Sequence, residues 1–374
     1  MEKGNMKVLE VNVDDIGMGG VFSLVRNVIE HRPSGMQIDI ATIEPFEKEE
    51  NIAYLNEKGC QVHFIGYTGQ KIIKQIVVIL KLIRLVKKEK YSCVHIHSDV
   101  SNKLLVSSLA SKIAGVGKII LHSHASGVDG KNRKLKKIYH NCCRRFLKYL
   151  ANEYLSCSDL AAEWMFPNVA REKIRLVKNG IDLKKFQFAS QKRDVLRREA
   201  GLESAFVVGH VGRFAYQKNH MFLLDVFQKI KSKCSAAKLL LVGEGELKND
   251  IVDATKEKGL TDSVIFWGVS NDVAGLMMAM DVFALPSHFE GLPIVGVEAQ
   301  STGLPVFFSD CITRTAQLTS NVHFLPIGQD HVDAWADAIS VCKCERRENC
   351  YDELKALGYD ISDTVNTLIG VYTA

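Results

Sequence analysis

Short apolar runs alternate with amphipathic helical patterns along most of this 374-residue chain. Such alternation is typical of α/β folds, in which buried parallel strands are joined by crossover helices. The runs that we expect to form strands are residues 6–13, 36–42, 93–96, 118–121 and 174–177, and then 206–211, 238–242, 264–267 and 281–285. The pattern breaks once and starts again, so we expect two α/β domains, each long enough to bury its own core.

The break lies at Lys178-Asn179-Gly180-Ile181-Asp182, a turn rich in residues that tolerate left-handed backbone. We therefore expect a first domain over residues 1–183 and a second over residues 184–350. Residues 351–374 carry a helical pattern of their own. The ten cysteines are scattered without a Cys-x-x-Cys pair, which favours free thiols in the cytoplasm over disulfides or a zinc site. The sequence shows no export signal and no apolar run of eighteen residues, so we expect neither secretion nor a membrane span.

Positive charge is concentrated in the first half of the chain. Residues 1–183 carry 28 Lys and Arg against 19 Asp and Glu, a net of +9, and residues 184–374 carry 20 against 24, a net of −4, which together give +5. Much of the excess lies in Lys131–Lys148, where apolar residues recur at helical spacing. These are Leu135, Ile138, Tyr139, Phe146, Leu147 and Leu150. A basic amphipathic helix binds anionic membranes or packs its stripe on its own domain, and both alternatives stay open here. No nucleic-acid-binding motif accompanies the charge, so we expect no nucleic-acid partner.

A glycine-rich turn, Gly17-Met18-Gly19-Gly20, follows the first expected strand and opens a helical pattern. Glycine lets the backbone approach a ligand closely, and a helix N-terminus attracts anions, so the turn is a candidate phosphate cradle. A plain strand-to-helix turn is the alternative. The dinucleotide fingerprint of dehydrogenases needs another glycine where this chain has Phe22, so a dehydrogenase is disfavoured.

Two cations follow the first expected strand of the second domain. Arg213 comes directly after Gly212, and Lys218 lies five residues further on, before a helix. An arginine fork and a lysine ammonium group that converge on one point would bind the diphosphate of a nucleotide sugar. Each such charge-assisted contact contributes about 1.5–3 kcal/mol. A surface loop with two solvated cations is the alternative.

Two glutamates flank a tight turn in Ser287-His288-Phe289-Glu290-Gly291-Leu292-Pro293 and Glu298-Ala299-Gln300. A strand, a Gly-Leu-Pro turn and a helix start favour anions, so a carboxylate at this point indicates a hydroxyl-rich ligand such as a sugar. Two alternatives remain. The carboxylates could merely favour a helix start. They could also be the acid and base of a glycosidase, a question that depends on a spatial separation that sequence spacing does not give.

Four histidines lie near the ends of two expected strands of the first domain. His122 and His124 follow residues 118–121, and His95 and His97 lie on the strand before, where we interpret them as structural. We see no acidic or cysteine ligand that would accompany this cluster, so we expect no zinc site. No Asp-x-Asp motif occurs in the sequence, so we also expect no metal ion on a bound diphosphate.

Three motifs follow one another along the second half of the chain. They are Gly-Arg-x-x-x-x-Lys-Asn over residues 212–219, Pro-Ser-x-Phe-Glu-Gly-Leu-Pro over 286–293, and Glu-x7-Glu at Glu290 and Glu298. In this the chain resembles the retaining, nucleotide-sugar-dependent glycosyltransferases of family 4, in particular the bacterial enzymes of exopolysaccharide and capsule synthesis. The likeness spans about residues 6–326. It implies the GT-B fold, in which two Rossmann-like domains face each other across a cleft and a C-terminal helix crosses back to the first.

The resemblance also implies roles for single residues. Arg213 and Lys218 would bind the donor diphosphate, and Glu290 would bind hydroxyls of the donor sugar. His122 would face that sugar, with His124 as its substitute, because the family's histidine directly follows the strand. The other implied contacts are Glu298 with the ribose, the N–H groups of Gly291 and Leu292 with the sugar or phosphate, and Gly19 and Gly20 with the diphosphate and the acceptor.

The expected function is transfer of a hexose from a UDP-sugar to a saccharide linked to polyprenyl pyrophosphate, with retained configuration and without a metal ion. We expect a cytoplasmic protein whose basic segment, Lys131–Lys148, touches the inner face of the plasma membrane. Related chains carry an acid near residues 312–315, where this chain has Thr315 and then Ala316, so its donor site is expected to differ there. A sugar-nucleotide epimerase of the same fold and a non-catalytic nucleotide-sugar-binding scaffold are the alternatives.

Overall fold

The computed structural model describes residues 6–16, 20–69, 71–130, 132–342 and 347–374. The chain divides into two compact units, the first made of Met1–Asn179 with Ile361–Ala374 and the second of Gly180–Asp360. The first division falls four residues before the boundary expected at residue 183. The second falls at residue 360, so residues 351–360 belong to the second unit. The return of the last helix to the first unit is confirmed.

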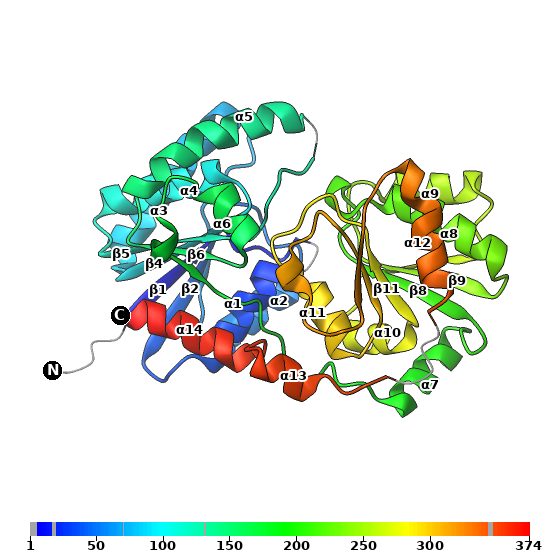
Figure 1. Cartoon of the computed structure of the whole chain (residues 1–374). Coiled ribbons are helices and arrows are strands. Elements are labelled where there is room, and N and C mark those ends of the chain that lie inside the picture. The colour runs from blue at the N-terminus through cyan, green and yellow to red at the C-terminus, as the bar shows by residue number, and fades with distance from the viewer. Residues whose placement is uncertain (1–5, 17–19, 70, 131, 343–346) are drawn as a thin grey trace. The chain divides into compact units, whose positions relative to one another are not determined.

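The first unit is built on a seven-stranded parallel sheet of order β3-β2-β1-β4-β5-β6-β7 (Figure 1). Its strands are β1 Met6–Val11, β2 Met36–Thr42, β3 Val62–Phe64, β4 Cys93–Ser98, β5 Lys118–Ser123, β6 Glu153–Ser156 and β7 Ile174–Leu176. Its helices are α1 Gly20–His31, α2 Glu49–Glu57, α3 Lys71–Glu89, α4 Ser101–Ala114, α5 Arg133–Cys143, α6 Asp159–Met165 and α14 Ile361–Thr373, with 3₁₀ turns η2 Arg144–Tyr149 and η3 Arg171–Lys173. The expected basic helix therefore ends at Cys143 and continues as a 3₁₀ turn.

The strands of the first unit point alternate side chains to two separate cores, as a buried parallel sheet requires. On one face, Val8 and Ile120 of the sheet pack with residues of α1 and of α14, which Figure 1 shows beside each other. On the other face, Leu9 and Leu121 pack with residues of α3 and α4. Because Glu10 alternates with Leu9, its side chain lies on the face that α1 and α14 cover.

The second unit is built on a six-stranded parallel sheet of order β10-β9-β8-β11-β12-β13. Its strands are β8 Phe206–Val211, β9 Ala237–Val242, β10 Val264–Gly268, β11 Val282–Leu285, β12 Val306–Ser309 and β13 Val322–Leu325. Its helices are α7 Ser190–Glu199, α8 His220–Lys233, α9 Lys248–Glu257, α10 Val273–Ala279, α11 Ile294–Ser301, α12 Val332–Ser340 and α13 Tyr351–Ala356, with 3₁₀ turns η4 Tyr216–Lys218, η5 Arg314–Ala316 and η6 Gln329–His331. Residues of α8, α9 and α12 share one core with the sheet.

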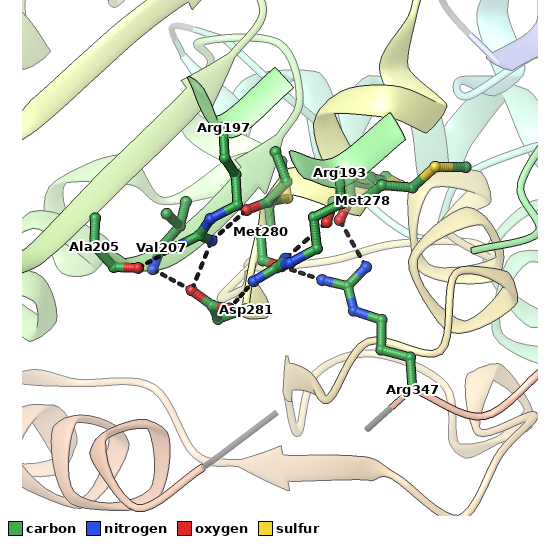
Figure 2. A network of polar contacts seen from close by, with 10 residues as sticks. Arg193, Arg197, Ala205, Val207, Met278, Met280, Asp281 and Arg347 are labelled. Atoms are coloured by element: carbon green, nitrogen blue, oxygen red, sulfur yellow. Dashed lines mark hydrogen bonds and ion pairs between the residues drawn. The ribbon is translucent and has the colours of Figure 1, made fainter. Parts of the chain in front are cut away.

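A buried carboxylate ties the second unit together at the amino end of β11 (Figure 2). Asp281 accepts hydrogen bonds from the guanidinium groups of Arg193 and Arg197, at 2.5 and 3.1 Å, and from the Val207 N–H at 2.8 Å. The two arginines come from α7 and also donate to the carbonyl oxygens of the last two residues of α10 and of Met280, which follows them. Arg347 donates to the carbonyl oxygen of Met280 in the same network. Since this network lies at the end of β11 opposite to its loop with Glu290, its role is structural.

Candidate active site

The loops that follow β8 and β11 lie side by side, because these two strands are neighbours in the sheet. The His288 N–H donates to the Gln217 carbonyl oxygen at 2.8 Å, and the rings of Tyr216 and His288 stack with centroids 4.3 Å apart. The strand order reverses between β8 and β11. In open α/β sheets, ligands bind at such a switch point, beyond the carboxyl ends of the strands.

Glu290 is the buried centre of this site. Its Oε1 accepts from Lys218 Nζ at 2.7 Å and from Ser287 Oγ at 2.8 Å, and its Oε2 accepts from Gln217 Nε2 at 3.1 Å. The side chains of Lys218 and Glu290 are only 13% and 7% exposed. The second cation and the first glutamate, which the sequence predicts as separate contacts, thus form one ion pair, and Lys218 is not a solvated surface cation. Arg213, on the same loop as Lys218, is exposed.

Two glycines allow close packing of the backbone next to this ion pair. A Cβ atom on Gly212 would lie 3.0 Å from Lys218 Cε, so a larger residue would displace the lysine. Gly243, after β9, has a φ of +137°, and a Cβ atom there would lie 2.2 Å from the Gly212 carbonyl oxygen. The Phe214 N–H donates to the Glu244 carbonyl oxygen at 2.8 Å, so the two loops support each other. The Gly-x-Gly pattern directly after an apolar run could have identified Gly243, but we had not predicted it.

Glu298 lies on α11, eight residues after Glu290, and is half-buried. Within the described part of the chain, no side-chain donor bonds its carboxylate. Burial raises the pKa of Glu298 to about 7, although the nearby Lys185 opposes the shift. A half-buried carboxylate of this kind is ready to accept hydrogen bonds from ligand hydroxyl groups, as the resemblance implies for the ribose.

Gln300, two residues after Glu298, connects α11 to a neighbouring segment of the chain. Its Nε2 donates to the Ala316 carbonyl oxygen at 2.9 Å, and its Oε1 accepts from the N–H groups of Leu318 and Thr319 at 2.8 and 3.0 Å. The segment that contains Thr315 and Ala316 is therefore attached to α11 by one buried side chain. Gly291 and Leu292 are buried in the turn before α11, and their contact with a ligand stays a prediction.

The two histidines predicted near the donor sugar occupy different positions in the first unit. β5 extends to Ser123, two residues beyond the expected end, so His122 lies inside the strand and is fully buried. His124 directly follows the strand and is half-buried, so by the criterion of position it takes precedence over His122. Gly20 is the exposed first residue of α1, and Gly19 lies outside the described residues.

Glu10 joins these histidines in a buried network. Its Oε2 lies 3.0 Å from His95 Nδ1 and 2.7 Å from His97 Nε2, so the expectation that no acidic residue accompanies the cluster is wrong. His95 Nε2 in turn lies 3.2 Å from His122 Nδ1, and His97 Nδ1 lies 2.9 Å from His124 Nε2. Burial alone would raise the pKa of the Glu10 carboxyl, but His95 and His97 more than offset it and hold that pKa well below its usual range.

Comparison with known proteins gives matches along both units. The family described as Glycosyltransferase Family 4 matches residues 18–185, and that described as Glycosyl transferases group 1 matches residues 205–342. The putative glycosyltransferase EpsF of Bacillus subtilis (strain 168) is 30% identical over 387 residues, which cover 100% of this chain and 97% of EpsF. UDP-Gal:alpha-D-GlcNAc-diphosphoundecaprenol alpha-1,3-galactosyltransferase of Escherichia coli is 28% identical over 274 residues, 72% of this chain and 70% of that protein.

Solved structures agree in fold. Anabaena HepE in complex with UDP-glucose superposes with a TM-score of 0.79 at 20% identity and covers 98% of both chains. The family matches along both units, together with the pair of parallel sheets, thus define the class as glycosyltransferases with the GT-B fold. Within that class the chain belongs to family 4, as its motifs predict.

Proposed function

We propose that this chain is a retaining hexosyltransferase that moves a sugar from a UDP-sugar to a lipid-linked saccharide in exopolysaccharide or capsule synthesis. The observation that carries the proposal is the Glu290 carboxylate, buried at a switch point between Lys218, Ser287 and Gln217. The names of relatives support the substrate classes. The E. coli relative is named for UDP-Gal and a diphosphoundecaprenol acceptor, and the HepE crystal contains UDP-glucose.

The chemistry assigns a task to each charged group. In the reaction, the bond between the anomeric carbon and the diphosphate oxygen breaks, and the acceptor oxygen forms the new bond on the same face of the ring. The acceptor's hydroxyl proton passes to the leaving phosphate. Arg213 would stabilise the negative charge that grows on the diphosphate, while Glu290 orients the sugar hydroxyls and Lys218 links the two. These cations would make a divalent ion on the diphosphate unnecessary.

Donor turnover in EDTA tests the proposal. UDP-, GDP- and ADP-sugars are each incubated with the protein and a membrane extract as the acceptor source, and release of nucleoside diphosphate is measured. We expect release from a UDP-sugar only, unaffected by EDTA and abolished in Glu290→Ala and Arg213→Ala. Lys256→Ala, which changes an exposed lysine of α9, is the matched control. Absence of release from every donor would favour the epimerase or the scaffold.

The raised pKa of Glu298 predicts how donor binding depends on pH. The ionised carboxylate accepts two ribose hydroxyl groups, whereas the protonated acid accepts them poorly. Because the pKa is about 7, affinity is expected to be full above pH 7 and to fall by up to tenfold per pH unit below it. Affinity should be measured by calorimetry with a UDP-sugar, because the terminal phosphate of UDP itself titrates near pH 6. Glu298→Gln should bind more weakly and without this pH dependence, and a slope that persists in the variant would assign it to another group.

The surface of α5 and η2 supports contact of the first unit with an anionic membrane. Leu135, Ile138, Tyr139 and Phe146 are 53–68% exposed, so the alternative that this stripe packs on its own domain is wrong for these residues. Of the six apolar residues of the stripe, Leu147 alone is buried, and Leu150 is half-buried. Arg133, Lys134, Lys136 and Lys137 are all exposed on the same helix, and Lys131 lies outside the described residues. No helix in the described ranges has the length and apolar content to cross a bilayer.

Reversing the charge of this surface is expected to weaken vesicle binding strongly. Each Lys near an anionic bilayer contributes about 1 kcal/mol, so changing Lys134, Lys136 and Lys137 to Glu should lower affinity for phosphatidylserine vesicles by more than about 100-fold. Neutral phosphatidylcholine vesicles provide the lipid control. Reversal of Lys229 and Lys233, exposed on α8, provides the protein control. Equal binding of all variants in a flotation assay would remove the membrane proposal.

A further inference from the structure

The buried carboxylate and histidines of the first unit lie where a ligand of this fold would bind. β1 pairs with β4, which sets Glu10 opposite His95, and β4 pairs with β5, which sets His97 opposite His122. The strand order of the sheet reverses between β1 and β4, so the network occupies a switch point near the carboxyl ends of the strands. The network therefore lies at a functional location, and burying its polar groups costs folding free energy.

The hydrogen bonds determine which nitrogen of His124 carries the proton. An ionised carboxylate only accepts, so the 2.7 Å contact with Glu10 requires an N–H on His97 Nε2. Burial and the neighbouring His95 lower the pKa of His97 to about 4, so at neutral pH it carries one N–H and its Nδ1 accepts. The 2.9 Å contact between His97 Nδ1 and His124 Nε2 then requires the N–H on His124 Nε2. His124 Nδ1 is left with a lone pair and has no hydrogen-bond partner among the described residues.

We propose that Glu10 and His97 are positioning residues that hold His124 in the tautomer whose Nδ1 accepts a hydrogen bond from a hydroxyl of the bound sugar. The inference rests on the proposed function, because a sugar hydroxyl is the partner that Nδ1 would receive. A buried carboxylate contributes little net stability compared with apolar residues of similar volume. Its effect on the tautomer of His124 accounts for its presence at this position.

Two further contacts fix Glu10 itself. The Tyr372 hydroxyl, from α14, donates to Glu10 Oε1 at 2.7 Å. This is the carboxylate oxygen that His97 does not contact. A second branch runs from Glu10 through His95 to His122, whose buried Nε2 has no partner among the described residues. Both branches begin at the same carboxylate, so a change at Glu10 should affect both.

A metal ion is the rival explanation for this cluster. His95, His97 and His122 offer ring nitrogens within 4.8 Å of one another, a separation that three ligands of one ion could reach after some contraction. However, the nitrogens of His95 and His122 and of His97 and His124 lie 3.2 and 2.9 Å apart, which are hydrogen-bond distances. Each of these histidines therefore already has a partner, which favours the hydrogen-bonded arrangement.

The tautomer can be measured directly on the full chain. In protein labelled with ¹⁵N-histidine, long-range ¹H–¹⁵N spectra distinguish an N–H on Nε2 from one on Nδ1, and the signals absent from His124→Gln identify His124. We expect the Nε2–H tautomer alone in the wild type. Glu10→Gln, whose amide can donate as well as accept, should give a mixture of tautomers. Tyr372→Phe, a milder change, should give a smaller shift in the same direction.

Turnover then tests the positioning role. Glu10→Gln should lower kcat about tenfold to hundredfold, by analogy with changes to groups that orient metal-bound histidines, and should change the donor KM by less than about threefold. Asp39→Asn is the matched control, because Asp39 is also a buried carboxylate of this sheet and accepts from Tyr91 Oη at 2.8 Å. We expect this control to leave kcat and the tautomer of His124 unchanged.

The outcomes separate the two proposals. An N–H on His124 Nδ1 in the wild type, or an unchanged tautomer in Glu10→Gln, would overturn the inference. So would a transition metal at one equivalent per chain in the purified protein that is lost in His95→Asn. A changed tautomer with unchanged kcat would overturn the positioning role but leave the proposed function intact. Absence of donor turnover in the wild type would remove the proposed function, and the spectra would still decide the tautomer.

Discussion

Lys218→Met is expected to lower kcat/KM for donor turnover by about 100- to 1000-fold, the range seen when one preorganised donor to a developing negative charge is removed. The lysine contacts Glu290 at 2.7 Å and both side chains are largely buried, so its loss removes a cation beside the position that we propose for the diphosphate and also frees the glutamate to move. Initial rates of nucleoside diphosphate release at saturating and at limiting donor concentrations would measure this fall in kcat/KM. Lys256→Met, which changes an exposed lysine of α9, should retain full activity.

A double variant separates the catalytic from the structural part of this effect. Lys218→Met alone removes one cation from the buried Glu290 and should lower the free energy of unfolding by about 1–3 kcal/mol. Adding Glu290→Gln removes the negative charge that Lys218 offset and should restore most of that stability. Turnover should stay low in the double variant. Recovery of both together would show that the pair serves only the fold.

Asp281→Ala is expected to destabilise the second unit by about 3–5 kcal/mol, because the change leaves the buried Arg197 without its carboxylate. It also removes the acceptor of the Val207 N–H and a partner of Arg193, so the amino end of β11 loses part of its attachment to α7 (Figure 2). Urea unfolding followed by circular dichroism would measure the loss.

An exposed ion pair of the same unit supplies the control for this experiment. Asp337 pairs with Lys233, but its side chain is 67% exposed, so Asp337→Ala should change the free energy of unfolding by less than about 1 kcal/mol. Equal losses for Asp281→Ala and Asp337→Ala would mean that burial does not determine the strength of the network. Both variants replace an aspartate by alanine, but Asp281 is buried and has three partners, whereas Asp337 is exposed and pairs with one lysine.

Most of the described strands could be predicted from the sequence, including β7 and β10 at sheet edges, whereas several short ones could not. Residues 206–211 form β8 as expected, because a strand buried on both faces of a parallel sheet is a continuous apolar run. β3 and β13, at the edges of their sheets, have three and four residues, several of them partly exposed, and so present no such run. We predicted neither, and we also missed β6 and β12, four-residue strands inside the two sheets.

Members of the candidate site could be proposed from the sequence, but their partners could not. The cation and glutamate motifs identify Lys218 and Glu290, yet their contact joins residues 72 positions apart and depends on β8 lying beside β11. Gln217 and Ser287 complete the site with side chains too common to stand out in a sequence. Glu10 is a stronger example, because it lies 87 positions from His97 and only strand pairing brings the two together.

The position of α14 in the first unit has a consequence for synthesis of the chain. Val365, Leu368 and Tyr372 belong to the same buried core as Val8 and Val25, although they are translated after the whole of the second unit. At 5–20 residues per second, the roughly 180 intervening residues take about 10–40 s to emerge. During that interval one face of the nascent first sheet has no covering helix from the C-terminus, so the second unit can finish folding before the first.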